Sequence, residues 1–182
     1  LLGERVPTTN IFTPLFRIAL ASGGTGGHLY PGLAITREMG SMHSDSRCLF
    51  IISEREVEAN ILKAAEFNFH QIPSCSPQWK NGLRFASKVL AGYRRAREIF
   101  EEFKPHAFVA LGGYACLAPA LAARSMGIPV FVAEQNCVAG RANTVLSFLA
   151  KGVFAPFAGM ERQFPWAKVF VTGNPVRAGA LA

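Results

Sequence analysis

Acidic residues are scarce in this sequence, and several patterns that would decide its class are missing. Its 182 residues hold 12 Asp and Glu against 19 Lys and Arg, a formal net charge of +7, which predicts an anionic partner. The four cysteines form no Cys-x-x-Cys pair and no cluster with zinc-site spacing, which favours reduced, buried thiols in a cytosolic protein. No apolar run approaches the ~20 residues of a membrane-spanning helix. Residues 1–15 make a poor signal peptide and are interpreted as an N-terminal extension.

Short apolar runs alternate with helical patterns over the rest of the chain. Strands are expected at 16–22, 48–53, 69–72, 107–111, 130–133 and 169–172. Helices are expected at 30–42, 56–65, 80–104, 116–126 and 140–150. Because the strands are continuously apolar rather than alternating, they belong to a parallel sheet that is covered on both faces. The sequence therefore predicts one α/β domain over residues 16–182, a Rossmann-like doubly wound parallel sheet.

A glycine cluster follows the first expected strand. Gly23, Gly24, Gly26 and Gly27 surround Thr25 and precede His28. Glycines let the backbone approach a ligand closely, and the helix N-terminus that follows suits a diphosphate or sugar hydroxyls. The positive end of a helix also favours a neutral imidazole, which is the form that a general base requires. His28 is therefore the candidate catalytic residue, with a purely structural histidine as the alternative.

Two nucleotide-binding motifs fit this loop poorly. A phosphate-binding P-loop would have Gly-Lys-Ser/Thr where the chain has Gly27 and His28. The dinucleotide pattern G-x-G-x-x-G meets Leu29 at its third glycine, although Glu54 could imitate its ribose-binding acid. An NAD-binding oxidoreductase domain is thus weakened as an alternative but stays open.

Two further loops follow later strands and carry polar groups. Gly112 and Gly113 precede Tyr114, whose ring and hydroxyl would stand at the edge of a ligand. Residues 134–136 (Glu-Gln-Asn) are unsuitable for a core and offer donors and acceptors for sugar hydroxyls. Because ligands of doubly wound sheets bind at the carboxyl ends of the strands, the loops are expected to meet there.

Four stretches together resemble the MurG family of glycosyltransferases. They are GGTGGHLYPGLA from Gly23, LGGYACLAPALAA from Leu111, GIPVFVAEQNCVAGRAN from Gly127 and VTGNPVR from Val171. They occur in the family's order, and the resemblance covers about residues 17–178. The chain departs from the family pattern at Cys116 and Ala118, where a small polar residue and a proline are common, which bears on the shape of the second loop.

The resemblance implies half of an inverting GT-B enzyme of peptidoglycan synthesis, the pathway behind cell wall biogenesis, cell shape and division. Such an enzyme moves GlcNAc from UDP-GlcNAc to the C4 hydroxyl of undecaprenyl-diphospho-MurNAc-pentapeptide, without a metal or other cofactor. The matching residues are His28 as the candidate base; Thr25, Gly26, Gly27, Asn136 and Arg177 toward the donor; and Gly112, Gly113, Tyr114, Glu134 and Gln135 toward the acceptor.

The same resemblance implies a second, C-terminal UDP-sugar domain that this sequence does not contain. We therefore expect the chain to fold by itself but not to turn over. A non-catalytic subunit of a split glycosyltransferase is the other alternative.

The expected helix over 80–104 concentrates the positive charge. Residues 79–97 hold six cations and no acid. This concentration of charge predicts that the helix docks on the anionic inner face of the cell membrane. A solvated basic face is the alternative, and nucleic acid is disfavoured because no aromatic stacking platform accompanies the charge. The residues expected to face the membrane are Trp79, Lys80, Leu83, Arg84, Lys88 and Leu90.

Overall fold

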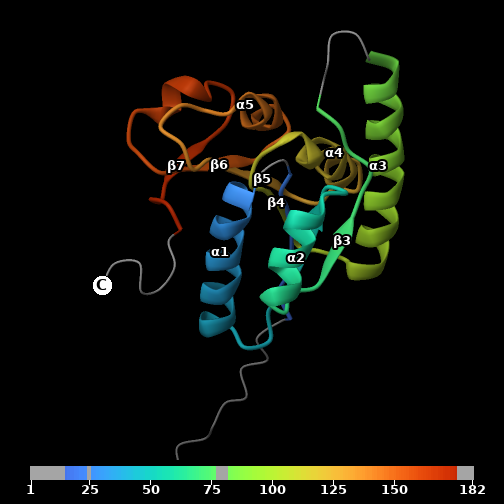
Figure 1. Ribbon diagram of the computed structural model, residues 1–182. Coiled ribbons are helices and arrows are strands. Elements are labelled where there is room, and N and C mark those ends of the chain that lie inside the picture. The colour runs from blue at the N-terminus through green and yellow to red at the C-terminus, as the bar shows by residue number, and fades with distance from the viewer. Residues whose placement is uncertain (1–14, 24–25, 77–81, 176–182) are drawn as a thin grey trace, which may run out of the picture.

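The protein forms one seven-stranded parallel sheet flanked by helices (Figure 1). The computed structural model describes residues 15–23, 26–76 and 82–175. The strands are β1 (Arg17–Ala21), β2 (Arg47–Ile52), β3 (Phe69–Gln71), β4 (Ala107–Ala110), β5 (Val130–Ala133), β6 (Gly152–Ala155) and β7 (Val169–Val171). The helices are α1 (Leu29–Met42), α2 (Glu56–Ala64), α3 (Gly82–Phe103), α4 (Leu117–Ser125) and α5 (Arg141–Ser147), with short 3₁₀ turns η1 (Gly26–His28), η3 (Tyr114–Cys116) and η4 (Met160–Gln163).

The fold class expected from the sequence is confirmed, with one strand missed. β6 was not expected, because its four residues lie between Lys151 and Pro156 in a stretch broken by glycine and proline. The neighbouring strand explains the glycine that begins β6. A Cβ on Gly152 would stand 2.7 Å from Cε2 of Phe170, so only a bare backbone fits beside that ring.

Helices cover the two faces of the sheet unequally. One face packs under α3, α4 and α5, where Phe100, Phe108 and Leu146 belong to a single buried cluster. The other face packs under α1 and α2, around Leu33, Phe50 and Leu62. Successive strand residues alternate between the two clusters, as a pleated strand buried on both sides requires. The alternation fixes which helices share a side of the molecule.

The strand order β3-β2-β1-β4-β5-β6-β7 places the topological switch between β1 and β4. From β1 the chain builds outward to β3 and then returns to add β4 on the other side, so β3 and β7 form the two edges in Figure 1. Ala21 and Ala110 are paired in register at the ends of β1 and β4. The two glycine loops therefore leave the sheet side by side at the point where such folds bind ligands.

Candidate functional site

The first and second glycine loops interlock at the switch point. The amide of Gly23 donates a hydrogen bond to the carbonyl oxygen of Gly112 (3.1 Å). Gly113 has φ +87° and ψ 160°, and a Cβ there would lie 2.6 Å from the carbonyl carbon of Gly23 and closer still to its oxygen. Only glycine allows this backbone contact and this conformation together. The two loops thus form a single structural unit.

His28 lies over the second loop and is held by the third. It ends η1 and precedes α1, and its Nδ1 is 3.3 Å from Oε1 of Gln135. The amide Nε2 of Gln135 donates to the carbonyl oxygen of Ala133 (2.7 Å), so Oε1 is left facing the imidazole as an acceptor. In a neutral imidazole this contact places the proton on Nδ1 and leaves Nε2 with a free lone pair. A Cβ on Gly112 would come within 2.9 Å of this ring, so glycine is needed there too.

A buried carboxylate organises the third loop. Glu134 is 2% exposed. Its Oε1 accepts hydrogen bonds from the backbone amides of Gln135 and Asn136 and from Nδ2 of Asn136, each at 2.9 Å. Its Oε2 accepts from the amide of Gly140 and from Nδ2 of Asn143, also at 2.9 Å. Five donors therefore occupy this carboxylate, which holds the third loop in shape. The sequence analysis, which placed Glu134 toward the acceptor, did not predict this structural role.

His28, the second and third loops and the start of α5 line an open cavity of about 270 Å³. It is lined by His28, Gly112, Gly113, Tyr114, Glu134, Asn136, Gly140, Arg141, Ala142 and Asn143. Most of the residues expected from the sequence thus meet in one place, and Gln135 joins them through His28. Gly26 and Gly27 form the 3₁₀ turn that leads into His28. Thr25 and Arg177 lie outside the described residues.

A second buried carboxylate, which the sequence analysis missed, lies beneath the first loop. Glu58 of α2 is 1% exposed. It accepts hydrogen bonds from the hydroxyl of Ser53 and, at 3.4 Å, from that of Ser22. Ser22 and Ser53 follow β1 and β2 directly, so Glu58 ties together the strand ends from which the first loop departs. The signal in the sequence was a glutamate on the same face of a short amphipathic helix as Leu62.

The thiol of Cys116 closes the base of the second loop. It donates toward the carbonyl oxygens of Ala21 (3.2 Å) and Gly112 (3.1 Å). Burial raises the pKa of this thiol to about 12, so it stays protonated at neutral pH and is no nucleophile. Cys116 therefore ties the base of the second loop to the end of β1.

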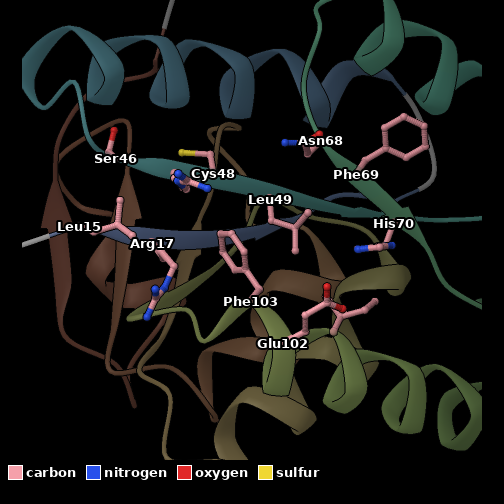
Figure 2. Close-up of a pocket in the computed structure, with 12 residues that line it drawn as sticks. Leu15, Arg17, Ser46, Cys48, Leu49, Asn68, Phe69, His70, Glu102 and Phe103 are labelled. Atoms are coloured by element: carbon pink, nitrogen blue, oxygen red, sulfur yellow. The ribbon is translucent and has the colours of Figure 1, made fainter.

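Another hollow, of about 710 Å³, lies away from these loops (Figure 2). It opens between the first residues of β1 and β2, strand β3 and the end of α3. Figure 2 shows Glu102 and Phe103 of α3 pointing toward the strands that carry Leu49 and His70. Because ligands of doubly wound sheets bind at the opposite, carboxyl ends of the strands, we do not assign the candidate site to this hollow.

The outer face of α3 is partly as expected. Leu83 and Leu90 are exposed, and so is Arg84. Lys88 instead forms an ion pair with Glu54 (Nζ–Oε2 3.0 Å). Glu54 is also the acid that could imitate the ribose-binding residue of an NAD site, and here its carboxylate is paired with Lys88. Trp79 and Lys80 lie outside the described residues, and no described helix is long and apolar enough to cross a membrane.

These features define an α/β domain of the doubly wound class with a cavity at its switch point, and comparison with known proteins gives the family. Residues 18–155 match the glycosyltransferase family 28 N-terminal domain. The chain belongs to this family.

Its curated relatives include MurG-type transferases. It is 38% identical over 168 residues to the UDP-N-acetylglucosamine--N-acetylmuramyl-(pentapeptide) pyrophosphoryl-undecaprenol N-acetylglucosamine transferase of Pelobacter propionicus, covering 91% of this chain and 44% of the relative. The enzyme of the same name from Cytophaga hutchinsonii is also 38% identical, over 89% of this chain and 45% of its own length. The chain thus spans less than half the length of these curated relatives.

Solved structures agree on the fold. The crystal structure of Acinetobacter baumannii MurG superposes with a TM-score of 0.74 at 29% identity, over 92% of this chain and 47% of that one. A UDP-GlcNAc 2-epimerase from Neisseria meningitidis has a TM-score of 0.68 at 20% identity, over 88% of this chain and 47% of its own. The second likeness concerns the fold alone. The match to MurG supports the GT-B architecture expected from the sequence.

Proposed function

We propose that this chain is the acceptor-binding half of an inverting N-acetylglucosaminyltransferase. The complete enzyme would move GlcNAc from UDP-GlcNAc to the C4 hydroxyl of undecaprenyl-diphospho-MurNAc-pentapeptide. One observation carries the proposal. In a chain 38% identical to MurG-type relatives, the family-type loops meet around a single cavity whose wall includes His28.

His28 has the chemistry of a general base in this proposal. With its proton held on Nδ1 by Gln135, the free Nε2 accepts the proton of the acceptor hydroxyl. The hydroxyl oxygen forms the new bond to C1 of GlcNAc as the bond from C1 to the UDP oxygen breaks, and UDP leaves with the electron pair. This single displacement inverts the configuration at C1. Base catalysis of this kind typically supplies about 10²–10⁴ in rate.

The donor would meet the first and third loops. Gly26 and Gly27 lead into α1, and the unpaired amides of a helix N-terminus favour a diphosphate. The Nδ2 group of Asn136 is turned toward Glu134 (2.9 Å), which leaves its carbonyl oxygen for a sugar hydroxyl. Tyr114 and the second loop would bound the acceptor sugar on the other side of the cavity. Thr25 and Arg177 stay predictions for the donor.

The membrane part of the proposal rests on α3. The lipid tail of the proposed acceptor stays in the bilayer, so the enzyme would work as a peripheral protein on the inner face of the cell membrane. Arg84 beside the exposed Leu83 suits an anionic headgroup layer. Binding of the chain to anionic liposomes should fall with salt and after Lys80→Glu/Arg84→Glu. Equal binding to neutral liposomes would reject the electrostatic account.

Replacing the imidazole tests the catalytic part. In a protein that joins this chain to a complete second domain, His28→Ala should lower kcat by about 10²–10⁴. His43→Ala is the matched control, because His43 is exposed at the other end of the same helix. Release of UDP from UDP-GlcNAc is the readout, with circular dichroism to show that the fold persists. A near-normal kcat for His28→Ala would remove this residue from the mechanism.

A further inference from the structure

The outward face of α5 is apolar where a solvated helix would be polar. Val145 and Phe148 are 55% and 60% exposed. At about 100° per residue, they share one face with Arg141, while Asn143, Leu146 and Ser147 on the opposite face are buried. The helix therefore buries one side in the core and presents a short apolar stripe on the other.

A tryptophan from a distant part of the chain extends this stripe. Trp166, in the segment between η4 and β7, is 56% exposed. Its ring meets that of Phe148 edge to face, with centroids 4.9 Å apart. Two large aromatic side chains thus pack on each other yet keep more than half of their surface in solvent. We call Val145, Phe148 and Trp166 the α5 patch.

The α5 patch lies on the same side of the molecule as the basic helix α3. Leu146 of α5 and Phe100 of α3 point into the same buried cluster, on the same face of the sheet. Both helices therefore cover the same face of the sheet. Helices α1 and α2 cover the other face.

Charge around the α5 patch suits an anionic surface. Residues 135–175 hold four cations and a single acid, Glu161. Arg141 begins the apolar stripe, and Lys151 follows the end of the helix; both are exposed. Aromatic rings edged by cations are typical of protein surfaces that enter the headgroup layer.

The stripe also begins at the candidate site. Arg141 lines the cavity beside His28 and Tyr114, and Phe148 follows seven residues later, a rise of about 10 Å along the helix. A lipid-linked acceptor needs its sugar in the cavity while its tail stays in the bilayer. The α5 patch would hold the mouth of the cavity close to that bilayer.

We propose that the α5 patch is a second membrane contact, which inserts Phe148 and Trp166 into the headgroup layer of an anionic bilayer. The proposal rests on the membrane association proposed above and adds a contact that α3 does not supply. It commits to a lipid surface rather than to a second copy of the chain.

Tryptophan fluorescence tests the proposal directly. The sequence has two tryptophans, so Trp79→Phe leaves Trp166 as the single reporter in the 182-residue chain. Vesicles of phosphatidylglycerol and phosphatidylcholine should shift its emission to shorter wavelength, and brominated acyl chains should quench it. The double variant Val145→Ser/Phe148→Ser should bind about tenfold more weakly, because insertion buries less apolar area.

A matched control variant and the outcomes that would overturn the proposal complete the test. Val57→Ser/Met42→Ser removes two exposed apolar side chains from α2 and α1 on the other side of the sheet, and it should bind as the parent chain does. If the chain binds vesicles while Trp166 stays unshifted and unquenched, the α5 patch is no membrane contact, although association through α3 survives. If the chain does not bind vesicles at all, both proposals fail. A shift that appears without vesicles and grows with protein concentration would assign the α5 patch to self-association and overturn the proposal.

Discussion

Substitution of Gly113 by alanine should separate the two interlocked loops. The residue has φ +87° and ψ 160°, a region that is essentially reserved for glycine and costs other residues about 1–3 kcal/mol. The added Cβ would also lie 2.6 Å from the carbonyl carbon of Gly23, which is backbone and cannot rotate away. Overpacking of this kind costs typically 1–3 kcal/mol more. We therefore expect Gly113→Ala to lower the free energy of unfolding by about 4 kcal/mol.

Gly159→Ala is a close control for the backbone term. Gly159 has the same φ of +87°, but its ψ is −6° and nothing lies within 4 Å of an added Cβ. The left-handed helical conformation alone costs an alanine about 1–2 kcal/mol. In a chain of this size, about 4 kcal/mol lowers Tm by roughly 8–16 °C. Thermal and urea unfolding, followed by circular dichroism, give both values. Equal losses in the two variants would refute the interlocked loops as the cause.

Three further predictions concern the carboxylate, the thiol and turnover. Glu134→Gln should lower the free energy of unfolding by about 1–3 kcal/mol, because an amide group would face donors that now bond to a carboxylate oxygen; an unchanged urea midpoint would contradict this. The raised pKa of Cys116, about 12 against 9.0, means that its contribution to stability is complete below pH 9 and is lost as the pH rises toward 12, since only the unfolded thiol ionises in that range. Stability should therefore fall more steeply above pH 9 than in Cys116→Ser, and parallel curves would argue against it. The 182-residue chain alone should release no UDP above background from UDP-GlcNAc and lipid-linked acceptor, because contacts in an open half-site do not offset the entropy of holding the donor; robust turnover would overturn the half-enzyme proposal, whereas activity restored by a second domain in trans would support it.

The fold followed from the sequence where glycine or proline bounds a strand or a helix. β5 occupies the expected residues, and α3 ends just before Pro105. β6 did not follow, because the reason for its glycine is the Phe170 ring of a strand that comes later in the chain. Periodicity within a segment carries no information about such a contact.

The candidate site was predictable to a similar degree. The glycine loops at strand ends correctly predicted that His28 lies near Gly112. The roles of Glu134 and Glu58 were not predictable, because each depends on donors that only the folded chain brings around a carboxylate. The proton position on His28 likewise depends on Gln135, which is 107 residues away in the sequence.

The carboxylate of Glu134 has a consequence for how a substrate would meet the third loop. Its five hydrogen bonds come from within residues 135–143. The loop is therefore shaped by its own chain and needs no ligand to order it. A substrate that arrives at such a loop loses little of its binding free energy to fixing the protein. The side chains of Gln135 and Asn136 would accordingly be preorganised for the sugar. Most of the entropy lost on binding would then come from the substrate itself.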